Sequence, residues 1–170
     1  GTISYATEHP TTFIKYIGNN IDWYYTGSSS TDNTRWQSSK TIYDPCPAGW
    51  RVADISVFEN LTIEAIDDNM SWEEAQPMYG WNLEDSATGE THFFTAAGRR
   101  NYLDGRLDII NDDDFRPIPW SGYYWTASTD GADAKALFFD LNTETRTWNG
   151  INTSRSMHRA NALPVRCTRE

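Results

Sequence analysis

Residues 40–52 read Lys-Thr-Ile-Tyr-Asp-Pro-Cys-Pro-Ala-Gly-Trp-Arg-Val, and this stretch carries the clearest fold signal in the chain. Pro45 and Pro47 each fix their own φ and restrict the residue before them, so residues 44–49 are predicted to form a stiff turn. The β-branched and aromatic residues 41–43 before the turn predict a short strand. After it, Asp54 is a candidate helix N-cap. Apolar side chains then recur at helical spacing and predict a helix over residues 55–67.

The rest of the chain predicts several short strands and little helix. Strands are expected over residues 11–17, 22–25, 92–95, 123–128, 136–141 and 163–167, and a second short helix near Ser71. The run 136–141 is apolar on both faces and is expected to be central. Residues 78–90 and 142–161 are polar and are expected to form long loops. Because strands and helices do not alternate regularly, the pattern indicates an α+β fold.

Composition limits both the size of the domain and its partners. A chain of 170 residues suits one compact domain, and 8 Trp, 9 Tyr and 7 Phe supply a core despite the polar composition. The net charge of −10 repels phosphate backbones, so nucleic acid is not an expected partner. No stretch approaches the roughly 20 apolar residues that span a bilayer, so this fragment is not expected to insert into a membrane. Gly1 at the start predicts a processed piece of a larger protein.

Candidate catalytic and metal-ligating residues are sparse. The three histidines, His9, His92 and His158, lie far apart in the sequence, and no hydrolase, metalloprotease or phosphate-loop motif is present. We therefore expect no catalytic residues and no cofactor. The run from Asp112 to Asp114 is expected to be a solvated loop, and a calcium site is the alternative.

The two cysteines, Cys46 and Cys167, lie too far apart in the sequence to form a local metal-binding pair. They either form a disulfide, which would close most of the chain into a loop, or remain two buried thiols. A disulfide would indicate an oxidising compartment.

Several blocks together resemble a domain of secreted and surface proteins of Bacteroidetes, which includes fimbrillin-like proteins and the Fibrobacter succinogenes major paralogous domain. The matching blocks are residues 40–52, Phe-Thr-Ala-Ala-Gly-Arg at 94–99, Gly-Tyr-Tyr-Trp-Thr-Ala-Ser at 122–128, Ala-Leu-Phe-Phe at 136–139 and Val-Arg-Cys at 165–167. The domain is similar to the C-type-lectin-like superfamily, to which formylglycine-generating-enzyme-like domains also belong. The calcium-binding triplets of true C-type lectins are absent, so no metal is expected.

The resemblance implies a C-type-lectin-like fold over residues 40–170, with a small, twisted, mostly antiparallel sheet, one or two helices and long loops. Residues 1–39 would add strands and a loop to the same domain. The resemblance also implies that the first and last strands meet, which would bring Cys46 and Cys167 together as a disulfide.

In that superfamily, the stretch corresponding to residues 142–159 forms part of an exposed binding face. Aromatic rings stack on sugars or anchor proteins, and Asn and Arg side chains orient the ligand, although any single ring could instead belong to the core. The candidate ligand-binding residues are Trp120, Tyr123, Trp148, Asn149, Asn152, Arg155 and His158.

The expected function is a non-enzymatic, extracellular binding module of a bacterial surface protein or pilus-associated adhesin. It would lie on the outer-membrane surface or a pilus and recognise a glycan or a host or bacterial surface protein. The alternative is a structural or assembly domain of a pilus or surface layer that binds no small ligand.

Overall fold

The computed structural model describes residues 3–14, 22–23, 31–63, 80–108, 121–142 and 147–170, and it is built mainly from antiparallel strands. This is a small, mostly-β or mixed α+β fold. The elements are α1 Ile3–Glu8, β1 Trp50–Val52, η1 Ile55–Val57 (a 3₁₀ turn), β2 Leu61–Ile63, β3 Gly80–Asp85, β4 Thr91–Thr95, β5 Arg99–Arg100, β6 Leu107–Asp108, β7 Ser121–Asp130, β8 Asp133–Asn142, β9 Thr147–His158 and β10 Cys167–Arg169.

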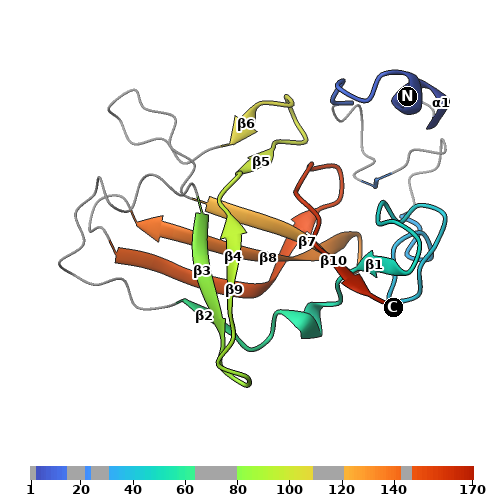
Figure 1. Ribbon diagram of the computed structural model, residues 1–170. Coiled ribbons are helices and arrows are strands. Elements are labelled where there is room, and N and C mark those ends of the chain that lie inside the picture. Colours follow the sequence, from blue (N-terminus) through green and yellow to red (C-terminus); the bar gives the residue numbers. More distant parts are fainter. Residues whose placement is uncertain (1–2, 15–21, 24–30, 64–79, 109–120, 143–146) are drawn as a thin grey trace.

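Two three-stranded sheets form the body of the molecule. The sheet β7-β8-β9 lies behind, and β3 and β4 of the sheet β2-β3-β4 cross in front of it (Figure 1). Leu83 and Phe94 from the front sheet pack against Tyr124, Leu137 and Phe139 from the back sheet. The even-numbered β8 residues from 134 to 138 contact a second cluster on the other face, so β8 is covered on both sides. The predicted central position of residues 136–141 is confirmed.

Gly122 is required where β7 passes under an aromatic ring. A Cβ atom at this position would lie 1.9 Å from Cζ of Phe139, the residue paired with Gly122 across the strands. We expect Gly122→Ala to lower the free energy of unfolding by about 1–3 kcal/mol, because the ring must leave its packed position. Urea denaturation measures the loss. The matched control is Ser121→Ala, which removes a buried hydroxyl that has no hydrogen-bond partner in the described part of the chain; a comparable loss in this control would contradict the explanation.

The second face of the β7-β8-β9 sheet is covered by residues from the first forty. Trp36 donates a hydrogen bond from Nε1 to the carbonyl of Thr126 at 2.6 Å. The Trp23 ring stacks on Trp36 with centroids 4.7 Å apart and meets Trp125 edge-on at 5.8 Å. These contacts attach Trp23 and Trp36 to the sheet.

The first strand after the proline-rich turn pairs with the last strand of the chain. Strand β1 runs antiparallel to β10, with Val52 opposite Cys167. Cys46 and Cys167 form a disulfide with their Cα atoms 5.8 Å apart, so the expected pairing is confirmed. Lys40 stabilises the proline-rich turn at residues 44–49, because its ammonium donates hydrogen bonds to the carbonyls of Cys46 and Trp50 at 2.6 and 2.8 Å.

The predicted helix over residues 55–67 is wrong as far as the structure describes it. Residues 55–57 form only the 3₁₀ turn η1, and the chain then enters β2 at Leu61. Phe58 and Leu61 are buried three residues apart, a spacing that a tight turn followed by a strand satisfies as well as a helix does. Asp54 makes no capping hydrogen bond, and its carboxylate instead lies 2.6 Å from the Arg51 guanidinium.

Two segments expected to be loops contain strands. Residues 78–90 include β3, which pairs with β2 on one side and β4 on the other. Residues 142–161 include the twelve-residue strand β9, which pairs with β8 along its length. Both segments are polar in sequence because one side of each strand is exposed. The other side faces the core, through Leu83 in β3 and Met157 in β9.

Other predicted elements have mixed outcomes. The strands expected at 92–95 and 123–128 are confirmed as β4 and β7. Residues 11–14, 22–23 and 41–43 are turns or irregular, so no strand forms there. Residues 163–166 form no strand, apart from a single bridge between Val165 and Trp125, and the terminal strand begins only at Cys167. The predicted short helix near Ser71 lies outside the described residues, as does the run from Asp112 to Asp114.

Candidate functional site

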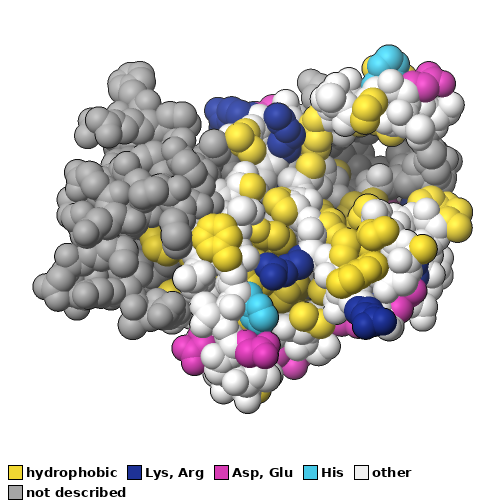
Figure 2. Space-filling model, viewed as in Figure 1, with side chains coloured by type: hydrophobic (Ala, Val, Ile, Leu, Met, Phe, Trp, Pro, Cys, Tyr) yellow, Lys and Arg dark blue, Asp and Glu magenta, His cyan; other side chains and the backbone are white. Residues whose placement is uncertain are grey.

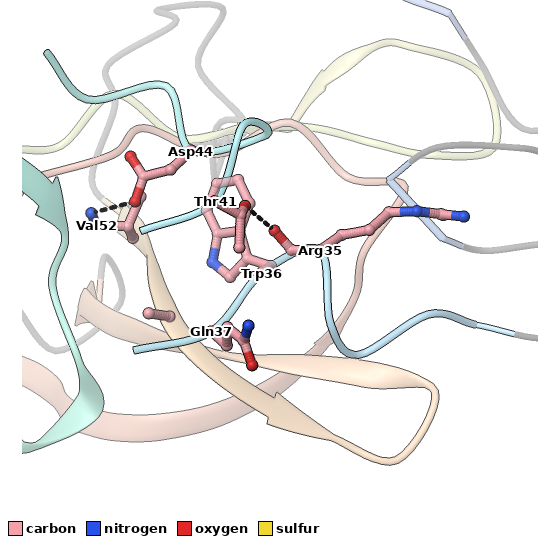
Figure 3. Close-up of a pocket in the computed structure, with 7 residues that line it drawn as sticks. Arg35, Trp36, Gln37, Thr41, Asp44 and Val52 are labelled. Carbon is pink, nitrogen blue, oxygen red and sulfur yellow. Dashed lines mark hydrogen bonds between the residues drawn. The ribbon is translucent and has the colours of Figure 1, made fainter. Parts of the chain in front are cut away.

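The proline-rich turn encloses a crevice that is a structural feature rather than a site. Its lining comprises Arg35, Trp36, Gln37, Thr41, Asp44, Val52 and Ala127 (Figure 3). The crevice leaves about 0 Å³ for a molecule the size of water. The one carboxylate among these lining residues is already paired, because Asp44 accepts from the backbone N–H groups of Cys46 and Val52 at 2.8 and 3.0 Å. The Thr41 hydroxyl donates a hydrogen bond to the carbonyl of Arg35.

A row of three side chains crosses the sheet β7-β8-β9. Tyr123 is paired with Phe138, and Phe138 is paired with Asn152. Residues directly opposite each other in an antiparallel sheet project from the same face, so the three side chains share one surface. The rings of Tyr123 and Phe138 are 4.9 Å apart, and Asn152 is exposed beside them.

A bulge in β9 adds an arginine to the same surface. Ala136 is paired with Arg155 and Phe138 with Asn152, so β9 contains one residue more than β8 between these pairs. Without the extra residue, Asn152 and Arg155 would point to opposite faces, because strand side chains alternate. The Arg155 guanidinium lies over the Phe138 ring, 4.1 Å from its centroid.

A second guanidinium covers the neighbouring ring. Arg99 in β5 lies over Tyr123, 5.5 Å from the ring centroid. Its strand is held beside β7 because Gly98 donates its N–H to the carbonyl of Ser121 at 2.9 Å. In the described part of the chain, no carboxylate lies within ion-pair distance of Arg155. We name the surface of Arg99, Tyr123, Phe138, Asn152 and Arg155 the arginine–aromatic face.

The structure brings together three of the seven residues predicted from the sequence. Tyr123, Asn152 and Arg155 lie on the arginine–aromatic face, although Tyr123 is only 7% exposed and serves as its floor. Trp120 lies outside the described residues. Trp148 and Asn149 belong to β9, where Trp148 pairs with Leu141, but their side chains lie outside the described part.

His158 is not part of this face. It is three residues beyond Arg155 on a regular strand and therefore projects to the opposite side. Its Nδ1 is 2.7 Å from the Asp133 carboxylate, and its ring meets Tyr102 edge-on at 4.8 Å. At the same end of the hairpin, hydrogen bonds from Lys135 and then Ser156 hold the pKa of Asp130 below its usual value.

Phe138 and Arg99 were missed by sequence reasoning. The run 136–141 is apolar on both faces and predicts a core position for Phe138, whereas its side chain is only partly buried and its pairing places it beside Tyr123 and Asn152. Arg99 lies in a two-residue strand that has no clear sequence signal.

The described residues contain no group of three or more His, Cys, Asp or Glu side chains placed to hold a metal ion. No helix among them is long and apolar enough to span a membrane. Comparison of the chain with protein-family models, curated proteins and solved structures finds no match in any of the three.

Proposed function

We propose that this chain is a non-enzymatic, extracellular ligand-binding module with a C-type-lectin-like fold, from a bacterial surface protein or pilus-associated adhesin. The observation that carries the proposal is the arginine–aromatic face, where two guanidinium groups lie over two adjacent rings beside an exposed amide. The pairing of β1 with β10 and the Cys46–Cys167 disulfide support the fold and an oxidising compartment.

The chemistry of this face favours a glycan with an anionic substituent. The Phe138 ring is only partly buried and, beside the Arg155 guanidinium that lies over it, offers an apolar edge that a sugar can contact. The planar fork of Arg155 matches the geometry of a carboxylate or a sulfate, and Asn152 can both donate and accept hydrogen bonds. A surface loop of a protein that presents a carboxylate would satisfy the same groups.

The proposal is tested by comparing the binding of the unaltered protein and of an Arg155 variant to an array of neutral and acidic glycans. Arg155→Met keeps the length of the side chain but removes its charge and its donors. We expect binding to acidic glycans to weaken about tenfold or more, since a hydrogen bond to a charged group contributes about 1.5–3 kcal/mol. Affinities of the bound glycans would be measured by isothermal titration calorimetry at two salt concentrations.

Lys135→Met is the matched control. Lys135 is also in the β7-β8-β9 sheet and also carries one positive charge, but it lies with Asp130 and Ser156 away from the arginine–aromatic face. Its loss should change affinity by less than about twofold. Equal effects of the two variants would show that only net charge matters. Failure to bind any glycan would exclude glycan recognition.

A second candidate is a structural or assembly domain, and the position of β9 favours it. In the part of the chain that the structure describes, β9 pairs with β8 alone and forms the edge of its sheet. An edge strand can pair with a strand of a neighbouring molecule. If the chain is an assembly domain, sedimentation velocity should detect polymers whose size increases with protein concentration. The Arg155→Met variant should form the same polymers as the unaltered protein.

A further inference from the structure

A second surface feature lies away from the arginine–aromatic face. It is a groove of about 200 Å³ between η1, the β3–β4 pair and β10. Ala53, Phe58, Leu61 and Phe94 form its apolar floor, and all four belong to the buried core beneath. Figure 2 shows apolar side chains gathered over β4 and β10 around a basic side chain and a histidine.

The size of the groove suits a single ring with a short substituent. An apolar cavity of about 150 Å³ is large enough to bind benzene. Val57 stands at the rim with 46% of its surface exposed, so a ligand there would also cover apolar area that is now in contact with water.

One positive charge is fixed at the groove. The Arg166 guanidinium lies over the Phe94 ring, 4.2 Å from its centroid, and Nη1 donates to the carbonyl of Phe93 at 2.9 Å. In the described part of the chain these are its polar and ring contacts, and no carboxylate pairs with it. Its other N–H groups remain able to bind an anion. Because both contacts already hold the side chain in place, little conformational freedom is lost on binding.

Two contacts of β4 make it unfavourable for an extended peptide to bind beside the groove as an additional strand of the sheet. The carbonyl of Phe93 accepts from Arg166, and the carbonyl of Thr95 accepts from the Tyr124 hydroxyl at 2.9 Å. These carbonyls lie on β4, the last strand of its sheet in the described part, so side chains already cap that edge. A small molecule fits the groove better than an extended chain does.

The acidic end of the groove lies apart from Arg166. Asp85 also lines the groove, but it is four residues along β3 from Trp81, the partner of Phe94. At about 3.3 Å per residue this places it about 13 Å from the Phe94 end. Its carboxylate already accepts from the backbone N–H of Ala87 at 2.8 Å. Thr168 adds a hydroxyl to the lining.

We propose that this groove binds a small carboxylate with an apolar, ring-sized body. The body would lie on the floor that Ala53, Phe58 and Leu61 form beside Phe94, and the carboxylate would meet the Arg166 guanidinium. This site is independent of the arginine–aromatic face and of the function proposed for it.

Phenylacetate is the test ligand, followed by amide chemical shifts in a nitrogen-15 labelled sample. We expect saturable shifts at residues that line the groove, such as Ala53 and Thr168, and much weaker binding of phenylacetamide and of acetate, which lack the charge and the ring respectively. Arg166→Met should weaken phenylacetate binding about tenfold or more. Arg169→Met, which removes the same charge from an exposed position three residues further along the chain, should leave it unchanged.

Two further variants keep the proposal testable if Arg166→Met does not fold. Val57→Trp, at an exposed position, should fill the groove and abolish binding, whereas Arg155→Met should have no effect. Equal binding of phenylacetamide and phenylacetate would overturn the role of Arg166. Absence of shifts at the groove residues at tens of millimolar phenylacetate would overturn the site itself.

Discussion

Removing the Cys46–Cys167 disulfide is expected to lower the free energy of unfolding by about 4–5 kcal/mol. The bond links residues 121 positions apart, so it removes many conformations from the unfolded chain, and loop-closure entropy gives a value of this size. Cys46 also packs with Val52 and Ala127 in a small buried cluster, so its loss leaves a packing defect in the native state. A loss of this size is comparable with the entire stability of many small domains.

The double variant Cys46→Ser/Cys167→Ser measures this effect in urea without reductant. Cys46→Ala/Cys167→Ala separates the cross-link from the cost of burying a hydroxyl. Dithiothreitol should shift the unfolding midpoint of the unaltered protein toward that of the variants and leave the variants unchanged. A difference below about 1 kcal/mol between oxidised and reduced protein would contradict a stabilising role.

Arg159→Met is expected to cost about 3–5 kcal/mol, because it leaves the buried Asp22 carboxylate without one of its two cations. The side chains of Arg159 and Asp22 are 0% and 1% exposed, with Nη1 and Oδ1 3.4 Å apart. Arg35 is the second cation, with Nη1 3.1 Å from Asp22. The Arg159 guanidinium also donates to the carbonyls of Asp133 and Gly131 at 3.0 and 2.9 Å, and both would lose a donor.

Arg155→Met is the matched control for this prediction as well. It removes the same charge from a position four residues earlier in the chain, but its guanidinium is only half-buried over Phe138, and such a contact contributes about 0.5–1 kcal/mol. Arg159→Lys should recover only part of the loss, since an ammonium cannot reproduce the planar set of donors. Equal unfolding midpoints for Arg155→Met and Arg159→Met in guanidinium chloride would contradict a stabilising role for the buried contacts of Arg159.

The Cys46–Cys167 disulfide and the Arg159–Asp22 ion pair each join residues that are far apart in the sequence. Arg159 also lies over the Trp23 ring at 4.8 Å, so its contacts help to attach Asp22 and Trp23 to the β8–β9 hairpin. The disulfide holds β10, and Cys167 and Arg166 both line the groove proposed for a small carboxylate. Reduction is therefore expected to weaken phenylacetate binding while leaving the arginine–aromatic face intact.

Some elements could be predicted from local sequence because local chemistry decides them. Pro45 and Pro47 fix their own φ whatever surrounds them, and aromatic and β-branched runs favour extended strands such as β4 and β7. Strand β9 was missed because Thr, Asn and Ser are equally common in loops. Its inward residues, Ile151 and Met157, are too few to reveal an alternating pattern.

The sequence alone determined the stiff turn, the strands β7 and β8 and, through the resemblance, the cysteine pair. Only the tertiary structure decided which side chains meet, because strand register depends on both partners and no local pattern encodes it. The bulge that puts Asn152 and Arg155 on one face is visible only in the pairing of β8 with β9. The groove beside Arg166 likewise exists only because β10 returns to β1 beside the β3–β4 pair.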